Sequence, residues 1–377
     1  MRDVVRAYGL HNALSVRHDE RPFIAIWEVT QACDLACVHC RACARPGRDA
    51  GELTTAEGFA LLDQLAEARV PLVVLTGGDP AKRPDLLPLV AYGAAAGLHM
   101  GLTPSATPLV TRSLIHELAG AGLKRLAISI DGPDAATHDE FRRVEGSFAH
   151  ALRILDEARA LGLRTQVNTT VHAKSIGRLR EMSELVARMG SVLWSVFYVV
   201  PTGRAELRML PTPEAVEASL EELVELAANA PFAVKTTAAP HYRRVLLERS
   251  TSGRGAVSHG VYGKDSERIN DGQGFLFVSH RGEIFPSGFM PINCGNVRES
   301  DPISVYREHP VFRDLRNASL LTGKCAACEY RRVCGGSRAR AFAVEGSMHA
   351  ADPLCAYIPP GYAPAAAEGR RRLSLIE

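Results

Sequence analysis

The stretch of sequence that decides the fold is residues 23–40, which read Phe-Ile-Ala-Ile-Trp-Glu-Val-Thr-Gln-Ala-Cys-Asp-Leu-Ala-Cys-Val-His-Cys. Its first eight residues are mostly apolar and predict a buried strand. The cysteines that follow, Cys33, Cys37 and Cys40, have the spacing C-x3-C-x2-C. Three thiolates on one short loop can hold three irons of a [4Fe–4S] cube and leave the fourth iron open to a ligand. A zinc site of four thiolates is the alternative for this loop.

Strand-like runs alternate with stretches of helical period after this loop. The strand-like runs are Ile24–Glu28, Leu72–Leu75, Leu98–Leu102, Leu126–Ile130, Thr165–Val171 and Leu193–Val199, and the helical stretches lie at about 54–69, 84–96, 111–121, 147–161, 176–190 and 214–229. Successive βα repeats imply right-handed crossovers and a parallel sheet. The sequence therefore predicts an α/β fold, a partial (β/α)6 TIM-like barrel with its chemistry at the C-terminal ends of the strands.

A second group of cysteines lies near the other end of the chain, at Cys325, Cys328, Cys334 and Cys355. Two separated thiol groups indicate two metal sites, and no HxxxH partner accompanies either one. Zinc in a four-thiolate site is the alternative here as well. Of the remaining cysteines, Cys43 is expected to bind no metal. Three roles stay open for Cys294: a buried thiol, a ligand of another cluster, or a donor of a hydrogen atom to a substrate radical.

Composition and charge exclude several classes of protein. The 377 residues carry 44 Lys and Arg against 42 Asp and Glu, a net charge of +2, whereas a general nucleic-acid binder has a clustered basic excess. The longest strongly apolar stretch, Val192–Val200, is far shorter than the ~20 residues of a membrane helix. The N-terminus lacks the apolar core of a secretory signal. We therefore expect a cytoplasmic protein with reduced thiols and with neither nucleic-acid nor membrane partners.

Polar residues follow the predicted strands at their C-terminal ends. Gly77, Gly78 and Asp79 come directly after the second strand, and the fourth strand ends at Ser129 with Asp131 just beyond it. Adjacent glycines let the backbone approach a ligand closely, and a neighbouring carboxylate can accept a hydrogen bond from an ammonium group. An ordinary turn or a capping role is the alternative for each of these residues.

Together with the C-x3-C-x2-C loop, these motifs resemble the radical S-adenosylmethionine (SAM) superfamily over residues 20–358. The resemblance implies that the three cysteines of the loop hold a [4Fe–4S] cluster to which SAM binds. In this family's Gly-Gly-Glu motif the acid contacts the SAM ammonium, and here Asp79 replaces the glutamate beside Gly77 and Gly78. The other implied SAM contacts are Ser129 and Asp131 with the ribose and methionine, Arg142 with the carboxylate, Asn168 with the ribose, and His39 and the segment beginning at Pro201 with the adenine.

The second cysteine group resembles the SPASM or twitch extension of radical SAM enzymes, a small Cys-rich module that binds auxiliary iron–sulfur clusters. A full SPASM module has seven cysteines. Here Arg338 stands where the C-x3-C partner of Cys334 is expected, and Ser287 stands where another cysteine would begin the module. The pattern therefore implies one auxiliary [4Fe–4S] cluster with four ligands: Cys325, Cys328, Cys334 and Cys355.

This resemblance divides the chain into five parts. We expect an N-terminal extension at 1–20, the core barrel at 21–235, a linker or mobile loop at 236–274, the auxiliary-cluster module at 275–358 and a tail at 359–377. Apolar runs at 274–278 and 282–286 flank a turn and predict a hairpin at the start of the module.

The implied activity is reductive cleavage of SAM to a 5′-deoxyadenosyl radical, which abstracts hydrogen from a substrate. A flavodoxin- or ferredoxin-type protein is the expected electron donor. The module, the short N-terminus and segments 40–42 and 201–205 look most like enzymes that modify the side chains of haem-type tetrapyrroles. One alternative is a peptide maturase, including the mycofactocin type, that forms a cross-link or decarboxylates its peptide oxidatively. A second is an epimerase or dehydrogenase of a sugar or other small metabolite, with Cys294 as hydrogen donor. A third is a non-catalytic iron–sulfur or zinc scaffold.

Overall fold

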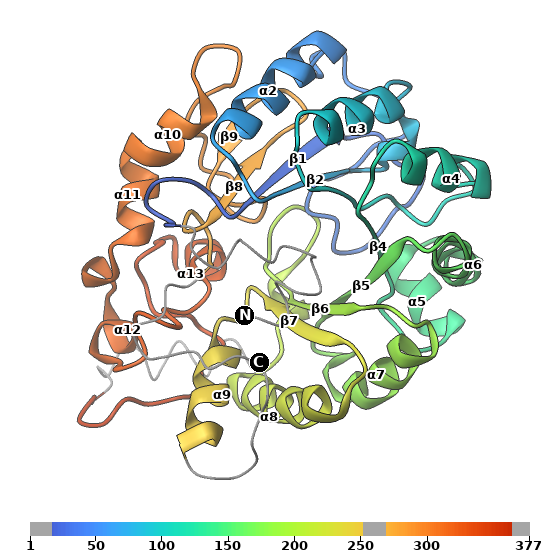
Figure 1. Cartoon of the computed structure of the whole chain (residues 1–377). Coiled ribbons are helices and arrows are strands. Elements are labelled where there is room, and N and C mark those ends of the chain that lie inside the picture. The colour runs from blue at the N-terminus through green and yellow to red at the C-terminus, as the bar shows by residue number, and fades with distance from the viewer. Residues whose placement is uncertain (1–16, 252–268, 364–377) are drawn as a thin grey trace.

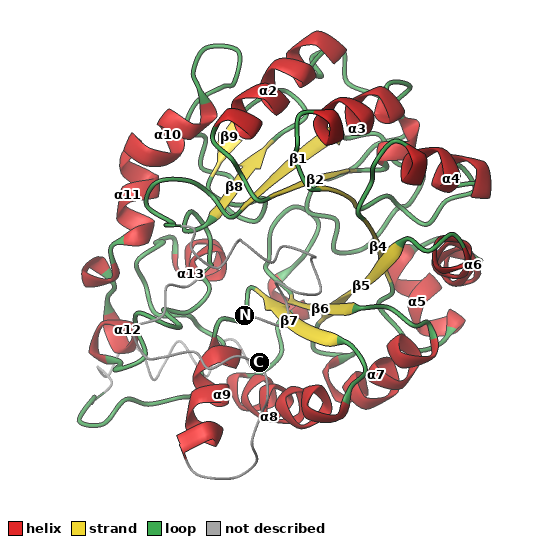
Figure 2. Ribbon diagram, in the orientation of Figure 1, coloured by secondary structure: helices red, strands yellow, loops and turns green. Residues whose placement is uncertain are grey.

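The computed structural model describes residues 17–251 and 269–363, which form one curved sheet with helices around it (Figures 1 and 2). The sheet has nine strands in the order β7-β6-β5-β4-β3-β2-β1-β8-β9. The strands are β1 (Ile24–Thr30), β2 (Leu72–Gly77), β3 (Met100–Leu102), β4 (Arg125–Ser129), β5 (Arg164–Val171), β6 (Leu193–Tyr198), β7 (Ala233–Thr237), β8 (Phe275–Val278) and β9 (Ile284–Phe285). Every neighbouring pair is parallel except β8 and β9.

Helices cover the convex face of the sheet, as Figure 1 shows. The helices between the strands are α2 (Thr55–Glu67), α3 (Leu86–Ala95), α4 (Arg112–Gly120), α5 (Ala135–Arg142), α6 (Ser147–Ala160), α7 (Leu179–Arg188), α8 (Pro213–Asn229) and α9 (His241–Thr251). After the sheet follow α10 (Pro302–Glu308), α11 (Pro310–Arg316), α12 (Gly323–Ala327) and α13 (Arg338–Glu345). This alternation of parallel strands and helices confirms the predicted partial barrel.

Local sequence explains how the first βα unit forms. Helix α2 begins where the pattern predicts, because the backbone N–H of Glu57 donates to the Thr54 hydroxyl at 3.3 Å while the Glu57 carboxylate accepts from the backbone N–H of Thr54 at 2.7 Å. The helix then packs tightly on β1. A Cβ atom on Gly58 would lie 2.6 Å from the ring of Trp27, which is fully buried. Helix α2 thereby holds one face of β1, and the C-terminal end of the strand leads into the cysteine loop.

The C-terminal part of the chain continues the barrel sheet. Strand β8 pairs in parallel with β1, from Ile24 opposite Phe275 to Trp27 opposite Val278. Strand β9 turns back against β8, which confirms the predicted hairpin. The strand that leads into the cysteine loop is therefore hydrogen-bonded directly to the C-terminal part. The five-part division of the chain remains a prediction.

The sequence suggested no regular structure at β7, α5, α9 or α10 to α13. Strand β7 adds a seventh parallel strand beyond β6, and helix α9 occupies part of the predicted linker at 236–274. The helix is rich in basic residues, yet Arg244 is buried and pairs with Glu217 of α8 and Glu248 of its own helix. Residues 252–268 of the predicted loop lie outside the described residues. Among the described helices, none has both the length and the apolar character needed to cross a bilayer.

Candidate functional site

The first cysteine group lies on the loop after β1. The side chains of Cys33, Cys37 and Cys40 pack into one cluster with Leu35, and burial raises the pKa of the Cys33 thiol. Each sulfur atom has a polar neighbour: the Ser105 hydroxyl lies 3.2 Å from Cys33, Arg142 Nη1 donates to Cys37 at 3.6 Å, and the Ala44 N–H donates to Cys40 at 3.4 Å. The chemistry of this donor set fits the three-thiolate cluster loop that we propose.

Cys43 differs from these three thiols. It is exposed, and its backbone has a φ of 48°. It does not belong to the packed group formed by the other cysteines of the loop. This placement agrees with the expectation that Cys43 is not a metal ligand.

A polar cavity of about 450 Å³ lies between the cysteine loop and the ends of β2, β3 and β4. Its lining contains four residues predicted to contact SAM: Gly77, Gly78, Ser129 and Arg142. Sequence reasoning missed the others, which are Leu35, Thr76, Thr103, Pro104, Ser105, Ala106 and His138. The end of β3 at residues 103–106 offered the same signal as the end of β2, because the carboxyl ends of parallel strands meet at one edge of the sheet.

The two glycines are required by a close backbone approach. A Cβ atom on Gly77 would lie 2.4 Å from the carbonyl oxygen of Thr30, and one on Gly78 would lie 2.4 Å from that of Ala32. The N–H of Gly78 donates to the Thr30 carbonyl at 2.8 Å, which locks β2 against the start of the cysteine loop. Any side chain at these positions would therefore push the loop away from the cavity.

Asp79, the predicted ammonium contact, is bound to the loop after β3. Its carboxylate is fully buried and accepts hydrogen bonds from the Thr107 hydroxyl at 2.7 Å and from the N–H groups of Ala81 at 3.1 Å and Ser105 at 3.3 Å. Asp79 is not among the residues that line the cavity. Asp79 fastens the loop after β3, and Ser105 on that loop reaches both Cys33 and the carbonyl of Gly78. The contact of Asp79 with the SAM ammonium stays a proposal.

Asp131 and Arg142 form a buried ion pair at the other side of the cavity. Arg142 Nε donates to the Asp131 carboxylate at 2.6 Å, and the same carboxylate accepts from the Thr170 N–H at 2.7 Å. Burial, the largest influence, raises the pKa of Asp131, but Arg142 and its other partners hold the pKa below its ordinary value. Arg142 lines the cavity, whereas Asp131 lies behind it. Asp131 thus orients Arg142, and the predicted contacts of both residues with SAM stay proposals.

The remaining predicted SAM contacts lie beyond this lining. His39 stacks on Phe141 at 4.2 Å between ring centroids, and burial lowers the pKa of His39 to about 3, so the ring is neutral. Asn168 sits opposite Ser129 in the β4–β5 pairing and accepts from Gln166 Nε2 at 2.7 Å. Pro201 follows β6 and is partly buried. Their contacts with SAM stay proposals.

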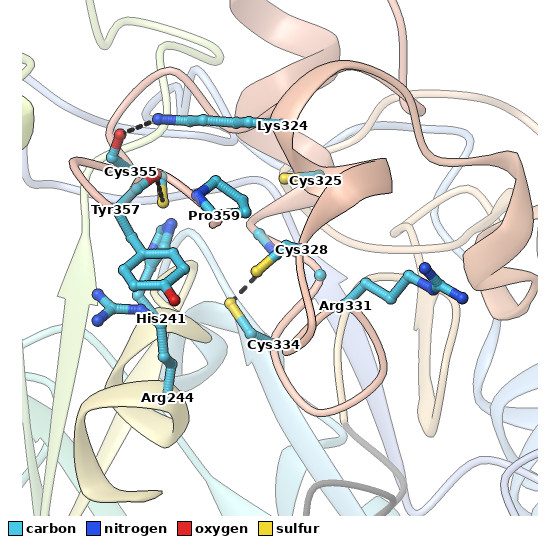
Figure 3. A pocket seen from close by; sticks show the side chains of 12 residues that line it. His241, Arg244, Lys324, Cys325, Cys328, Arg331, Cys334, Cys355, Tyr357 and Pro359 are labelled. Atoms are coloured by element: carbon cyan, nitrogen blue, oxygen red, sulfur yellow. Dashed lines mark hydrogen bonds between the residues drawn. The ribbon is translucent and has the colours of Figure 1, made fainter. Parts of the chain in front are cut away.

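The second cysteine group surrounds a cavity of its own, shown in Figure 3. Its lining includes Cys325, Cys328, Cys334 and Cys355 together with His241, Arg244, Lys324 and Arg331. Burial raises the pKa of both the Cys328 and Cys355 thiols to about 11. In the part of the chain that the structure describes, no three His, Cys, Asp or Glu side chains converge on a single metal ion. Four thiols around one cavity fit the four-thiolate cluster that we propose.

Cys294 lies apart from both cavities. Its side chain belongs to the main apolar core, and its thiol donates a 3.4 Å hydrogen bond to the carbonyl of Ile292. Burial raises the pKa of the Cys294 thiol to about 12. It lines neither the cavity beside the first cysteine group nor that of the second. The placement favours the buried-thiol alternative over a hydrogen donor.

Comparisons with known proteins match both the sequence and the fold. A family model described as the Radical SAM superfamily matches residues 27–186. The chain is 38% identical over 337 residues to an AdoMet-dependent heme synthase of Nitratidesulfovibrio vulgaris, covering 88% of this chain and 92% of the relative. It is 28% identical over 360 residues to an Fe-coproporphyrin III synthase of Methanosarcina barkeri, covering 91% of this chain and 89% of the relative. Among solved structures, SuiB of Streptococcus suis bound to S-adenosylmethionine has a TM-score of 0.72 at 16% identity, covering 90% of this chain and 78% of SuiB.

Proposed function

The chain belongs to the radical SAM superfamily, and from this premise we propose that it converts propionate side chains of an iron tetrapyrrole to vinyl groups. It is an enzyme that uses SAM and a [4Fe–4S] cluster. The proposal adds an auxiliary cluster held by the four C-terminal cysteines. The observation that carries the proposal is the 38% identity to an AdoMet-dependent heme synthase over nearly the full length of both chains. Haem carries vinyl groups at two positions where coproporphyrin carries propionates.

Different residues around the first cavity would bind the cluster and SAM. Cys33, Cys37 and Cys40 would hold the cluster, and Arg142 would pair with the carboxylate of SAM. When bound, the cluster and SAM supply the 5′-deoxyadenosyl radical that accepts a hydrogen atom from the substrate. The glycines at the end of β2 let the backbone come close to SAM, and the buried walls of the cavity keep water from the reacting carbon.

The substrate chemistry balances as an oxidative decarboxylation. The carbon next to the ring loses a hydrogen atom to the 5′-deoxyadenosyl carbon. The bond between the second carbon and the carboxylate then breaks, carbon dioxide leaves, and one electron leaves the side chain as the vinyl double bond forms. Two such events turn a coproporphyrin into the porphyrin of haem, and each consumes one SAM.

An unpaired cation beside the cysteine loop supports a substrate with carboxylates. The N–H of Arg204 donates to the Cys40 carbonyl at 3.0 Å, and a Cβ atom on Gly203 would lie 2.4 Å from the carbonyls of Cys40 and Arg41. This turn is therefore pressed against the loop. The Arg204 side-chain atoms Nε and Nη2 are buried, and neither has a hydrogen-bond partner among the described residues. Buried guanidinium nitrogen atoms without a partner are costly, and a propionate would satisfy them.

The proposal includes a flavodoxin- or ferredoxin-type electron donor and a cytoplasmic location. Each reaction cycle needs one electron at low potential from outside the chain. All nine cysteines are free in the structure, which suits a reducing compartment.

The test is an anaerobic assay with the iron-loaded full chain, dithionite, SAM and iron coproporphyrin III. We expect 5′-deoxyadenosine together with porphyrins that have lost one and then two molecules of carbon dioxide, both followed by mass spectrometry. Cys40→Ala should form neither product. If 5′-deoxyadenosine appears while the porphyrin stays unchanged, the substrate assignment is wrong and peptides become the next candidates. Without any SAM cleavage in the iron-loaded chain, the cluster assignment itself fails.

A further inference from the structure

Arg338 is a buried cation next to the second cysteine group. It is the first residue of α13, and only 1% of its surface is exposed. Its Nη2 atom lies 3.9 Å from the sulfur of Cys325, one of the four thiols that line the second cavity. The guanidinium therefore contacts a proposed cluster ligand, although Arg338 is not among the residues that line the cavity.

The other contacts of Arg338 are all with neutral groups. Its Nη1 donates to the carbonyls of Met348 at 3.0 Å and Ala350 at 2.7 Å, and its Nε donates to that of Gly336 at 3.3 Å. Within residues 17–251 and 269–363, no carboxylate pairs with it. These carbonyls fix the orientation of the guanidinium but leave its positive charge without a partner.

Arg340, two residues further along the same helix, shows what a compensated cation looks like in this region. It is equally buried, and its Nε and Nη2 donate to the carboxylate of Asp352 at 2.9 and 2.8 Å. A buried charge is stable only when an opposite charge and hydrogen bonds offset its lost hydration. Arg340 has both within the chain, whereas Arg338 has only the hydrogen bonds.

Gly336 keeps the guanidinium beside the sulfur. Its φ is +67°, and a Cβ atom there would lie 2.6 Å from Nη2 of Arg338 and 3.5 Å from the sulfur of Cys325. A larger residue would therefore force Arg338 away from the thiol. The backbone is shaped to bring this cation close to Cys325.

We propose that Arg338 is the counter-charge of the auxiliary cluster and raises its reduction potential. This inference rests on the proposal that the four C-terminal cysteines hold an iron–sulfur cluster. Four thiolates and their iron–sulfur core carry net negative charge, which grows by one unit on reduction. A fixed cation in a buried setting stabilises the more negative form, so the cluster is a better electron acceptor with Arg338 than without it. The auxiliary cluster is then the acceptor of the electron that is released when the substrate side chain becomes a vinyl group.

The test compares Arg338→Gln, Arg338→Lys and Arg331→Gln in the full chain, with Cys33, Cys37 and Cys40 changed to Ala so that only the auxiliary cluster remains. Arg331 also lines the cavity, but it is exposed, so its charge is screened by water. Iron content shows whether the site is loaded, and a redox titration followed by electron paramagnetic resonance gives the potential.

We expect Arg338→Gln to lower the ratio of reduced to oxidised cluster at a fixed ambient potential about tenfold, which is about 59 mV for one electron. Arg338→Lys and Arg331→Gln should titrate like the parent. If the Gln variant loses its iron while the Lys variant keeps it, the charge itself is required and the proposal stands. Unchanged potential in a fully loaded Gln variant, or loss of iron in both variants, overturns it. A parent chain that binds no iron would instead refute the cluster assignment.

Discussion

Replacing Asp352 by asparagine should destabilise the C-terminal part of the chain by about 3–5 kcal/mol. The Asp352 carboxylate is fully buried and accepts from two backbone N–H groups, those of Ser337 at 2.6 Å and Leu354 at 3.1 Å. It also accepts from Nε and Nη2 of Arg340. Arg340 in turn donates to the carbonyl of Val199 at 3.4 Å, so the ion pair ties α13 to the end of β6.

The magnitude follows from what asparagine leaves behind. The substitution keeps the shape of the side chain but removes the charge, so Arg340 becomes a buried cation without a partner. Each hydrogen bond to a charged group contributes about 1.5–3 kcal/mol, and Arg340 makes two of them to Asp352. Burial, the largest influence, raises the pKa of Asp352, but Arg340 draws that pKa far below its ordinary value. The carboxylate is therefore ionised at neutral pH, and the full effect of the substitution should appear there.

The assay is the thermal midpoint of the iron-loaded chain, measured anaerobically at one scan rate. A loss of 3–5 kcal/mol corresponds to a decrease of about 4–6 °C, taking an unfolding entropy of about 0.8 kcal/mol/K for a chain of this length. Asp156→Asn is the matched control, because Asp156 pairs with Arg159 at the surface, where such a pair contributes about 0–1 kcal/mol. Adding Arg340→Met to Asp352→Asn should recover part of the loss, since no buried charge then remains. A decrease of less than 2 °C for Asp352→Asn would refute this reasoning.

Three further substitutions probe the first site and the metal content. Gly78→Ala should lower the free energy of unfolding by about 1–3 kcal/mol, because the added Cβ would lie 2.4 Å from the Ala32 carbonyl. It should also reduce the iron content, measured by iron assay, and SAM binding, measured by calorimetry. Normal iron content and normal SAM binding would contradict the close approach. Arg204→Gln should raise the KM for the porphyrin at least tenfold without changing the Kd of SAM, and an unchanged KM would remove Arg204 from the substrate site. The reconstituted chain should bind about eight irons, and changing Cys33, Cys37 and Cys40 to Ala should leave about four and abolish SAM cleavage; stoichiometric zinc would contradict both cluster assignments.

The fold could be predicted from regular patterns within short stretches of the sequence. The strands β1 to β6 and the helices α2, α3, α4, α6, α7 and α8 follow from apolar runs and helical periods, and the start of α2 follows from Thr54 and Glu57. Strand β7 escaped because residues 233–237 read Ala-Val-Lys-Thr-Thr, which is short and half polar. Helix α9 escaped because its basic residues suggest solvent, whereas Arg244 is buried by pairing with carboxylates on α8 and α9. Pairing across the fold overrides local composition in both places.

The sequence did not show which way the side chains of the site point. An acid after two glycines suggested a ligand contact for Asp79, and the structure adds that its carboxylate also accepts hydrogen bonds from Ser105 and Thr107 at the next strand end. Nothing in the local sequence indicates that these residues meet. The same limit applies to Arg338, which the cysteine spacing identified only as a missing ligand. Its guanidinium proves to contact Cys325, a residue outside its own helix.

The connection between β1 and β8 explains how one chain can serve two separated sites with fixed geometry. Glu28 of β1 is buried and forms an ion pair with Arg41, the residue after Cys40. The same carboxylate is 2.8 Å from Nδ1 of His280, which follows β8. The guanidinium of Arg41 also lies 4.6 Å from the ring centre of Phe277 on β8. The loop of the first cysteine group is thus fastened to the strand pair that begins the C-terminal part. Because catalytic groups must be held within a fraction of an ångström, this buried contact makes the position of the first site depend on the packing of β8.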